Sequence, residues 1–219
     1  MKLSRISLLA LIMSASPTRG QNLQIHYDLG EDREYLTSTL EMFKPDSSGS
    51  TYFFVDFDYD AGNTGSASLA YWEFIRYFHV AALPGLSWTI QFNDGVAPWG
   101  PLGDVWLAGL SYPLNLGIIT LSTELLYRRA RFSDGPDLQF TAVWFRPFME
   151  GRFTFSGFLD VWTAQLADAG REIVVLVEPQ LWYRLWPTIS LGSELEVSRN
   201  FLPDDGWLFK PTVAVKWFF

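Results

Sequence analysis

The segment ISLGSELEVS (residues 189–198) alternates between two kinds of side chain. One set is mainly apolar and includes Leu191 and Val197, and the other is polar and includes Glu194 and Glu196. Successive side chains of a β-strand point to opposite faces of the sheet, so a period of two is the pattern of a strand. The segment predicts a strand with one face in an apolar environment and the other face among polar groups.

The same period recurs along most of the chain beyond residue 20, where a helical period is nearly absent. We expect about twelve strands, and several of them exceed the usual length of strands in soluble proteins. Long alternating segments suit tilted strands that cross a membrane. The expected strands cover residues 23–29, 35–43, 50–59, 66–78, 86–93, 104–112, 117–129, 136–148, 151–164, 172–185, 189–200 and 207–219.

This pattern predicts an all-β fold, a transmembrane antiparallel β-barrel in the bacterial outer membrane. A soluble β-sandwich or a lipocalin-like barrel also alternates, and it is the main alternative. The apolar face is continuous over long strands and rich in aromatic side chains, which make up 17% of the residues. These features favour contact with outer-membrane lipid over a soluble core.

The first residues of the chain have the three parts of a secretory signal peptide. Lys2 and Arg5 supply positive charge, residues 6–13 are apolar, and residues 14–20 are mostly small and polar. The apolar run is too short for a helix that spans a membrane. We therefore expect a signal peptide at residues 1–20 and an outer-membrane β-barrel at residues 21–219.

The connections between the expected strands differ in length. Those at residues 113–116, 149–150 and 186–188 are short, whereas those at residues 94–103 and 130–135 are longer. Outer-membrane barrels have short periplasmic turns and longer outer loops. An even number of strands then predicts that both chain ends lie on the periplasmic side.

The last segment, TVAVKWFF (residues 212–219), alternates up to the final side chain. Its apolar face includes Trp217 and Phe219, which we expect to contact lipid in a periplasmic girdle of aromatic residues. Lys216 lies on the opposite face. This strand must pair with the first strand to remove both open edges of the sheet.

Residues 66–78 alternate least clearly, because Glu73 shares a face with Leu69, Tyr71 and Ile75. A β-bulge within the strand is one explanation. A set of aromatic side chains that faces inward is the other, and the pattern alone leaves both open.

If lipid contacts the apolar faces, the polar alternates point into the barrel lumen. Eight-stranded barrels are filled by side chains and sixteen-stranded barrels enclose a channel, so a narrow pore and a partly plugged lumen are both open here. The expected lumen and solute-binding residues are Tyr52, Phe54, Asp56, Asp58, Glu124, Arg128, Asp160, Trp162, Glu178, Gln180, Arg184, Glu194, Glu196 and Lys216.

The composition argues against several other functions. His26 and His79 are the only histidines and no serine motif accompanies them, so we expect no enzyme. The net charge of −8 disfavours binding to a nucleic acid polymer. The sequence has no cysteine, and it predicts no catalytic residue, no cofactor and no metal.

Three motifs lie close together near the start of the expected barrel: EMFKPD (residues 41–46), GSTYFFVDFDY (residues 49–59) and YWEF (residues 71–74). They resemble the corresponding region of the Tsx-like nucleoside-specific channel-forming proteins of bacterial outer membranes, and of a related uncharacterised outer-membrane barrel family. The resemblance implies a twelve-stranded barrel and passive uptake of nucleosides. The terminal aromatic residue resembles the signal read by the outer-membrane assembly machinery, which is therefore an expected partner.

The sequence thus predicts a passive outer-membrane channel for small hydrophilic solutes, with nucleosides as the class that the resemblance implies. The alternative is a non-conducting barrel that is a subunit of a larger outer-membrane complex and binds another outer-membrane protein. Long aromatic strands fit that role equally well.

Overall fold

The computed structural model describes residues 20–30, 33–59, 66–166, 170–202 and 206–219, and within these ranges the regular structure consists of β-strands. No helix in the described ranges is long and apolar enough to cross a membrane. The strands are β1 (Gln21–Asp28), β2 (Leu36–Asp46), β3 (Gly49–Tyr59), β4 (Ala67–His79), β5 (Ser87–Ala97), β6 (Gly100–Pro101), β7 (Val105–Asn115), β8 (Thr120–Ala130), β9 (Asp137–Phe148), β10 (Phe153–Leu166), β11 (Gly170–Trp186), β12 (Ile189–Arg199) and β13 (Trp207–Phe218).

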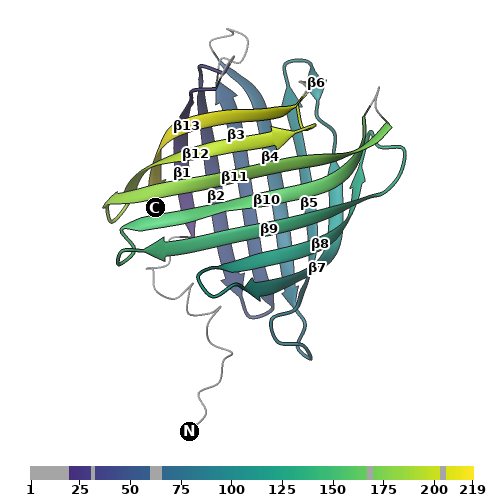
Figure 1. Cartoon of the computed structure of the whole chain (residues 1–219), viewed down its shortest axis with the longest axis horizontal. Helices are drawn as coiled ribbons and strands as arrows, with labels where there is room; N and C mark the ends of the chain where they lie inside the picture. The colour runs from purple at the N-terminus through teal and green to yellow at the C-terminus, as the bar shows by residue number, and fades with distance from the viewer. Residues whose placement is uncertain (1–19, 31–32, 60–65, 167–169, 203–205) are drawn as a thin grey trace.

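Each long strand pairs antiparallel with the next long strand along the chain, and β1 also pairs with β13. The described residues therefore form a closed barrel of twelve long strands, to which the short β6 adds only at the end of β5. In Figure 1, strands β9 to β13 in front cross β1 to β5 behind at a steep angle, as the tilted strands of a barrel do. The predicted transmembrane antiparallel barrel is confirmed.

The observed strand limits lie close to the expected ones, with one clear difference. Residues 94–103 were expected to be a loop, but β5 continues to Ala97 and Val96 pairs with Pro101 of β6. The Leu102 N–H also donates to the Gly95 carbonyl at 2.9 Å. The connection therefore forms a small hairpin in which backbone groups hydrogen-bond to one another. Its turn includes Gly100, whose φ of 129° favours glycine.

The two ends of the barrel differ in their connections. One end, which we call the turn end, has short connections such as those after Asp46 and Trp186, and both Gln21 and Phe218 lie there. The other end, which we call the loop end, has longer connections such as the one between Ala97 and Val105. This arrangement places the two termini of the barrel at the same end (Figure 1), as the even number of strands requires.

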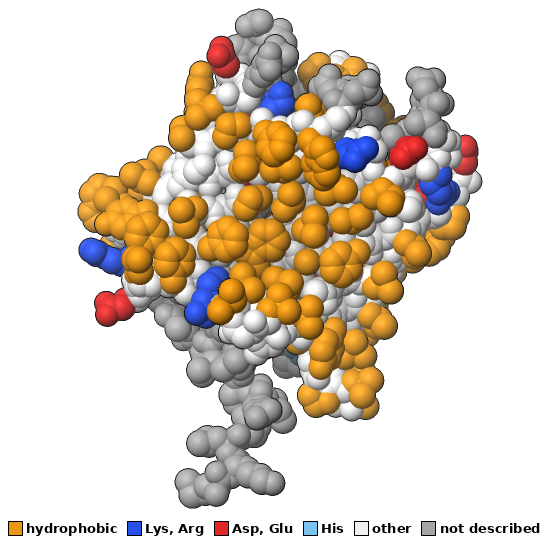
Figure 2. Space-filling view, in the orientation of Figure 1, with side chains coloured by type: hydrophobic (Ala, Val, Ile, Leu, Met, Phe, Trp, Pro, Cys, Tyr) orange, Lys and Arg blue, Asp and Glu red, His pale blue; other side chains and the backbone are white. Residues whose placement is uncertain are grey.

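The outside of the barrel is mainly apolar. Figure 2 shows hydrophobic side chains across the middle of one face, with Lys, Arg, Asp and Glu mainly toward its ends. On β13, Val213, Val215 and Trp217 are exposed, whereas Thr212 and Lys216 are buried. An exposed apolar band along long strands is what a lipid bilayer requires. Phe219 is also exposed, as expected for a lipid contact, and it lies at the rim of the lumen as well.

The irregular pattern of β4 has a simple cause. Leu69, Tyr71, Glu73 and Ile75 all line the interior, so the strand presents an aromatic and aliphatic set inward around its carboxylate. The pairing of β3 with β4 shifts register only near Tyr59, at the loop end. The inward-facing set, and not a bulge beside Glu73, therefore explains the sequence.

Candidate functional site

A cavity of about 3030 Å³ occupies the inside of the barrel. Its lining includes Gln21 and Phe218 at the turn end and Arg33, Trp99 and Phe201 at the loop end. The cavity thus extends from one end of the strands to the other. We call it the lumen.

All of the residues that the sequence assigned to the lumen line this cavity. They are Tyr52, Phe54, Asp56, Asp58, Glu124, Arg128, Asp160, Trp162, Glu178, Gln180, Arg184, Glu194, Glu196 and Lys216. The alternation places them there, because each occupies an inward position of its strand. Their role in binding a solute stays a prediction.

These residues do not form one cluster. Glu124 is buried on β8, where it accepts hydrogen bonds from the Tyr77 hydroxyl at 2.5 Å and from Gln91 Nε2 at 2.6 Å. Arg184 lies exposed at the turn end and donates to the Glu150 carbonyl at 3.3 Å. The Trp162 ring lies 5.3 Å from the Arg128 guanidinium carbon. Glu124 and Arg184 are therefore less accessible to a solute in mid-lumen than the strand pattern suggested.

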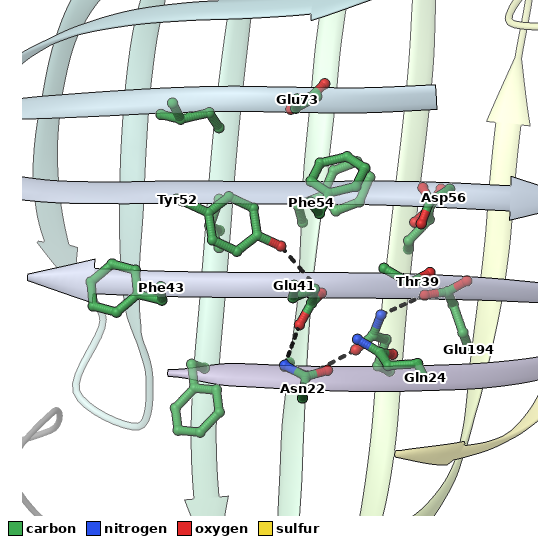
Figure 3. Close-up of a pocket in the computed structure, with 18 of the residues that line it drawn as sticks. Asn22, Gln24, Thr39, Glu41, Phe43, Tyr52, Phe54, Asp56, Glu73 and Glu194 are labelled. Atoms are coloured by element: carbon green, nitrogen blue, oxygen red, sulfur yellow. Dashed lines mark hydrogen bonds between the residues drawn. The ribbon is translucent and has the colours of Figure 1, made fainter. Parts of the chain in front are cut away.

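One wall of the lumen, formed by β2, β3 and β4, combines aromatic rings with carboxylates. The Phe54 ring lies 5.9 Å from the rings of both Tyr52 and Tyr71. The Tyr52 hydroxyl donates to Glu41 at 3.2 Å, and the Tyr71 hydroxyl donates to Glu73 at 2.6 Å. Figure 3 shows Tyr52, Phe54 and Glu41 side by side on this wall. The wall offers flat apolar faces beside hydrogen-bond acceptors.

The opposite wall, formed by β10, β11 and β12, carries more carboxylates. Glu178 on β11 lies within electrostatic range of Asp160, Glu194 and Glu196 on its own wall, and of Asp56 on β3. Since β3 and β11 come from opposite sides of the closed sheet, carboxylates from the two walls converge across the lumen. Gln180 Nε2 donates a hydrogen bond to Glu194 at 2.5 Å, and this amide is neutral.

The strands that close the barrel, β13 and β1, carry a tighter polar cluster. We call it the closing seam, and it consists of Gln24, His26, Thr212 and Lys216, which are all buried. His26 Nδ1 and the Thr212 hydroxyl are hydrogen-bonded at 2.9 Å. Lys216 Nζ lies 4.0 Å from the centroid of the Trp182 ring on β11. These contacts connect the first and last strands of the barrel, and the four residues line one side of the lumen.

Residues 33–35 line the lumen at its loop end. Arg33, which lies between β1 and β2, has its Nη1 2.7 Å from a Glu196 oxygen and 3.5 Å from an Asp28 oxygen. The Tyr35 hydroxyl donates to Asp58 at 3.3 Å. The described part of this segment is thus held by carboxylates of β1, β3 and β12, and it lines the lumen at this end.

The sequence pattern missed several residues of the site. Asn22, Gln24, Glu41, Tyr71 and Glu73 line the lumen although they were not among the expected solute-binding residues. The alternation of β1 and β2 contains the signal for the first three, because each lies in phase with inward residues. Tyr71 and Glu73 were not expected there, because the inward face of β4 combines apolar side chains with one carboxylate.

Two solved porins share this fold. The structure entitled "NanC porin structure in rhombohedral crystal form" is 11% identical, with a TM-score of 0.59 over 91% of this chain and 99% of that chain. The structure entitled "KdgM porin in complex with disordered oligogalacturonate" is 10% identical, with a TM-score of 0.54 over 90% of this chain and 99% of that chain. Both are porins and neither is described as an enzyme. The likeness concerns the fold.

No curated protein matches the chain. The shared fold and the apolar exterior establish an outer-membrane β-barrel. This agrees with the fold and location that the resemblance to the Tsx-like channels implied. A specific relation to the Tsx-like channels has no support from these matches. Residues 20–219 match the family described as "Domain of unknown function (DUF5020)", and the chain therefore belongs to this family.

Proposed function

We propose that this barrel is a passive channel for small hydrophilic solutes. The observation that carries the proposal is the lumen, a cavity of about 3030 Å³ whose lining runs from the turn end to the loop end. Polar and charged side chains line its middle, and they favour water and polar solutes over lipid or an apolar ligand. The fold of NanC and KdgM, which are both porins, agrees with this role.

Nucleosides are the solutes that we propose first, because the motifs of β2, β3 and β4 resemble those of the Tsx-like channels. The rings of Tyr52, Phe54 and Tyr71 offer surfaces on which a base can stack. Glu41 and Glu73, beside them, accept hydrogen bonds and suit the hydroxyl groups of a sugar.

Acidic sugars are less suitable solutes for this lumen. KdgM was solved with oligogalacturonate, a chain of acidic sugars. Here Asp56 and Glu178 approach from opposite walls, and Glu194 lies near both. Carboxylates repel an anionic solute in a narrow space. We therefore propose that neutral and cationic solutes pass more readily than anionic ones.

Two further proposals concern how the barrel reaches the membrane. Residues 1–20 act as a signal peptide for export, although residues 1–19 lie outside the described part of the chain. The outer-membrane assembly machinery then recognises the last strand, whose exposed face ends with Trp217 and Phe219. Outer-membrane lipid surrounds the finished barrel.

Flux into liposomes tests the channel. Liposomes that contain the purified barrel should take up uridine and ribose, and should take up galacturonate more slowly. Trp162→Ala and Asp160→Asn should slow uridine entry, because both residues line the lumen. Asp134→Asn is the matched control, since Asp134 is exposed and is not part of the cavity lining.

Two results would contradict the proposal. Equal rates of uridine entry in all variants would show that Trp162 and Asp160 do not contact the solute during transport. If neither uridine nor ribose enters, the barrel is not a channel, and the non-conducting subunit of a larger complex becomes the better function. A stable partner should then co-purify with it.

A further inference from the structure

Three carboxylates meet in the middle of the lumen. Asp56 on β3 lies within electrostatic range of Glu41 on β2 and Glu194 on β12, and Glu194 lies within range of Glu41. All three line the cavity and are only partly buried. Figure 3 places Glu41, Asp56 and Glu194 around one region of the lumen. We call these residues the carboxylate triad.

The chain supplies little positive charge to this triad. Lys216 lies within electrostatic range of Glu41 and Glu194, but its Nζ packs on the Trp182 ring at 4.0 Å. Arg33 pairs with Glu196 and Asp28 instead. None of the ion pairs between described residues includes a member of the triad. One ammonium group therefore faces two members of the triad, and no ion pair between described residues includes Asp56.

Two buried oxygen atoms near the triad lack a hydrogen-bond donor. Oδ1 of Asp56 is buried and accepts no hydrogen bond within the described structure. The same holds for Oδ1 of Asn22, a side chain that is only 9% exposed. Asn22 Nδ2 donates to Glu41 at 2.8 Å, so this orphaned oxygen lies next to the triad. Buried acceptors usually have a donor, and a bound N–H group would supply it.

An aromatic surface lies between the acceptors. Phe54 pairs directly with Glu41 across β2 and β3, and it lies two residues from Asp56 on the same inward face. The rings of Tyr52 and Tyr71 lie on either side at 5.9 Å. The faces of aromatic rings attract organic cations and also pack against their apolar parts.

A metal ion fits these residues less well than an organic cation. Among the described residues, no group of three or more His, Asp or Glu side chains is placed to hold a metal ion. The triad is spread over two walls with an aromatic ring between two of its members. An elongated cation with several N–H groups and an apolar body uses both kinds of surface.

We propose that Glu41, Asp56 and Glu194, together with Phe54 and Asn22, form a binding site for a small organic cation that carries an ammonium or guanidinium group. The proposal rests on the proposed function, since it names a solute class for the same lumen. The cationic group donates to the carboxylates and to the free oxygens of Asp56 and Asn22, and the body of the solute packs on Phe54.

Current block in a planar bilayer tests the proposal with three probes of one shape. Benzylammonium is cationic, benzyl alcohol is neutral and benzoate is anionic. Benzylammonium should reduce the potassium current at concentrations about tenfold lower than benzyl alcohol, and benzoate should have the least effect. Equal block by benzylammonium and benzyl alcohol would overturn the proposal.

Variants locate the site. Asp56→Asn and Glu194→Gln should each raise the half-blocking concentration of benzylammonium about tenfold, because each removes a charged acceptor. Phe54→Leu should raise it less, and Asp134→Asn should leave it unchanged. Heat-modifiable migration in gels shows whether each variant is folded. Folded triad variants that are blocked like the original barrel would contradict the site.

Calorimetry separates this site from the channel function. Benzylammonium should bind to the detergent-solubilised barrel and benzyl alcohol should not, whether or not the barrel conducts. Binding without any current would contradict the channel but support the cation site. Current without preferential binding or block by benzylammonium would contradict the cation site but support the channel.

Discussion

The closing seam and the wall formed by β3 and β4 follow the same alternating pattern, yet their side chains have different surroundings. On β1 and β13 burial switches with each residue: Gln24 is 1% exposed and Lys216 is 7% exposed, whereas Val213 is 51% exposed. On β3 nearly all side chains are partly buried, on both faces. A period of two therefore determines only which side of the sheet a residue faces. What an inward residue contacts depends on the strands across the lumen.

The hydrogen bonds of the two regions differ as well. In the seam, His26 bonds to Thr212 and Lys216 packs on Trp182. On the wall, Asp56 keeps an oxygen without a donor. The contacts of His26, Thr212 and Lys216 hold the barrel closed, although Gln24 Nε2 in the seam is buried without a hydrogen-bond partner. The wall retains an unused acceptor on Asp56 and excess negative charge. Substitutions should affect stability at the seam and solute selection at the wall.

The largest effect is expected at the end of the seam. Deleting Phe219 should strongly reduce the amount of barrel assembled in the outer membrane, because the last strand then lacks the ring that packs at 5.0 Å from Trp217 and the N–H that donates to the Gln21 carbonyl at 3.4 Å. Membrane fractionation with heat-modifiable migration measures it. Phe132→Ala, at an exposed aromatic residue of the loop end, is the control. Unchanged assembly would show that the terminal aromatic residue is not needed.

A steric change on β12, the strand that pairs with β13 beside the seam, is expected to be next in size. In Gly192→Ala the new Cβ would lie 2.3 Å from Trp182 Cε3 and 2.7 Å from the Leu181 carbonyl oxygen. Overpacking of this kind should lower the free energy of unfolding by about 3 kcal/mol, measured by urea unfolding in lipid vesicles. Gly135→Ala is the control, since its nearest neighbour is the end of the Arg171 side chain at 3.5 Å. If both variants lose a similar free energy of unfolding, steric crowding at Gly192 is not the cause.

Lys216 in the seam and Asp56 on the wall each carry one charge, and removing these charges should have different effects on stability. Lys216→Met keeps much of the side-chain volume but removes the ammonium group that packs on Trp182, and should lower the free energy of unfolding by about 2 kcal/mol. Asp56→Asn on the wall should not lower it, because no ion pair is lost and one of several mutually repelling carboxylates is removed. The same urea experiment measures both. If both variants lose the same free energy of unfolding, the seam does not contribute more to stability than the wall.

The smallest effect is expected to be stabilising. Glu178→Gln removes one of several carboxylates that lie within electrostatic range of one another, including Asp56, Asp160 and Glu194. Relief of this repulsion should raise the free energy of unfolding by about 1 kcal/mol at neutral pH and low salt. High salt should reduce the difference, because dissolved ions screen charges in a channel of the proposed kind. A lowered free energy of unfolding would mean that Glu178 has a stabilising partner.

The strands could be predicted from the sequence because a membrane barrel repeats one simple rule. Strand β12, expected at residues 189–200, spans Ile189–Arg199. The short β6 could not be predicted, since its two residues, Gly100 and Pro101, carry no periodic signal. The inward position of Glu73 was also undecided, because its neighbours Tyr71 and Ile75 look like residues that face lipid.

The inward positions of the site were predictable, but the contacts were not. His26 and Thr212 are 186 residues apart, and only the register between β1 and β13 brings them together. Alternation contains no information about that register or about which carboxylates face each other across the lumen. This is why Glu124 was expected to be accessible, although Tyr77 and Gln91 cover it.

The pairing of β1 with β13 also constrains the order of events during folding. Strand β1 is made first, yet it gains its second neighbour only when the last strand arrives. Until then its backbone N–H and C=O groups form an open edge, which is able to pair with another chain. Closure over such a long sequence separation is slow, so the nascent protein needs protection for most of that time. Closure therefore waits for the last strand, and a chaperone that shields the edge of β1 should matter more than one that shields any internal strand.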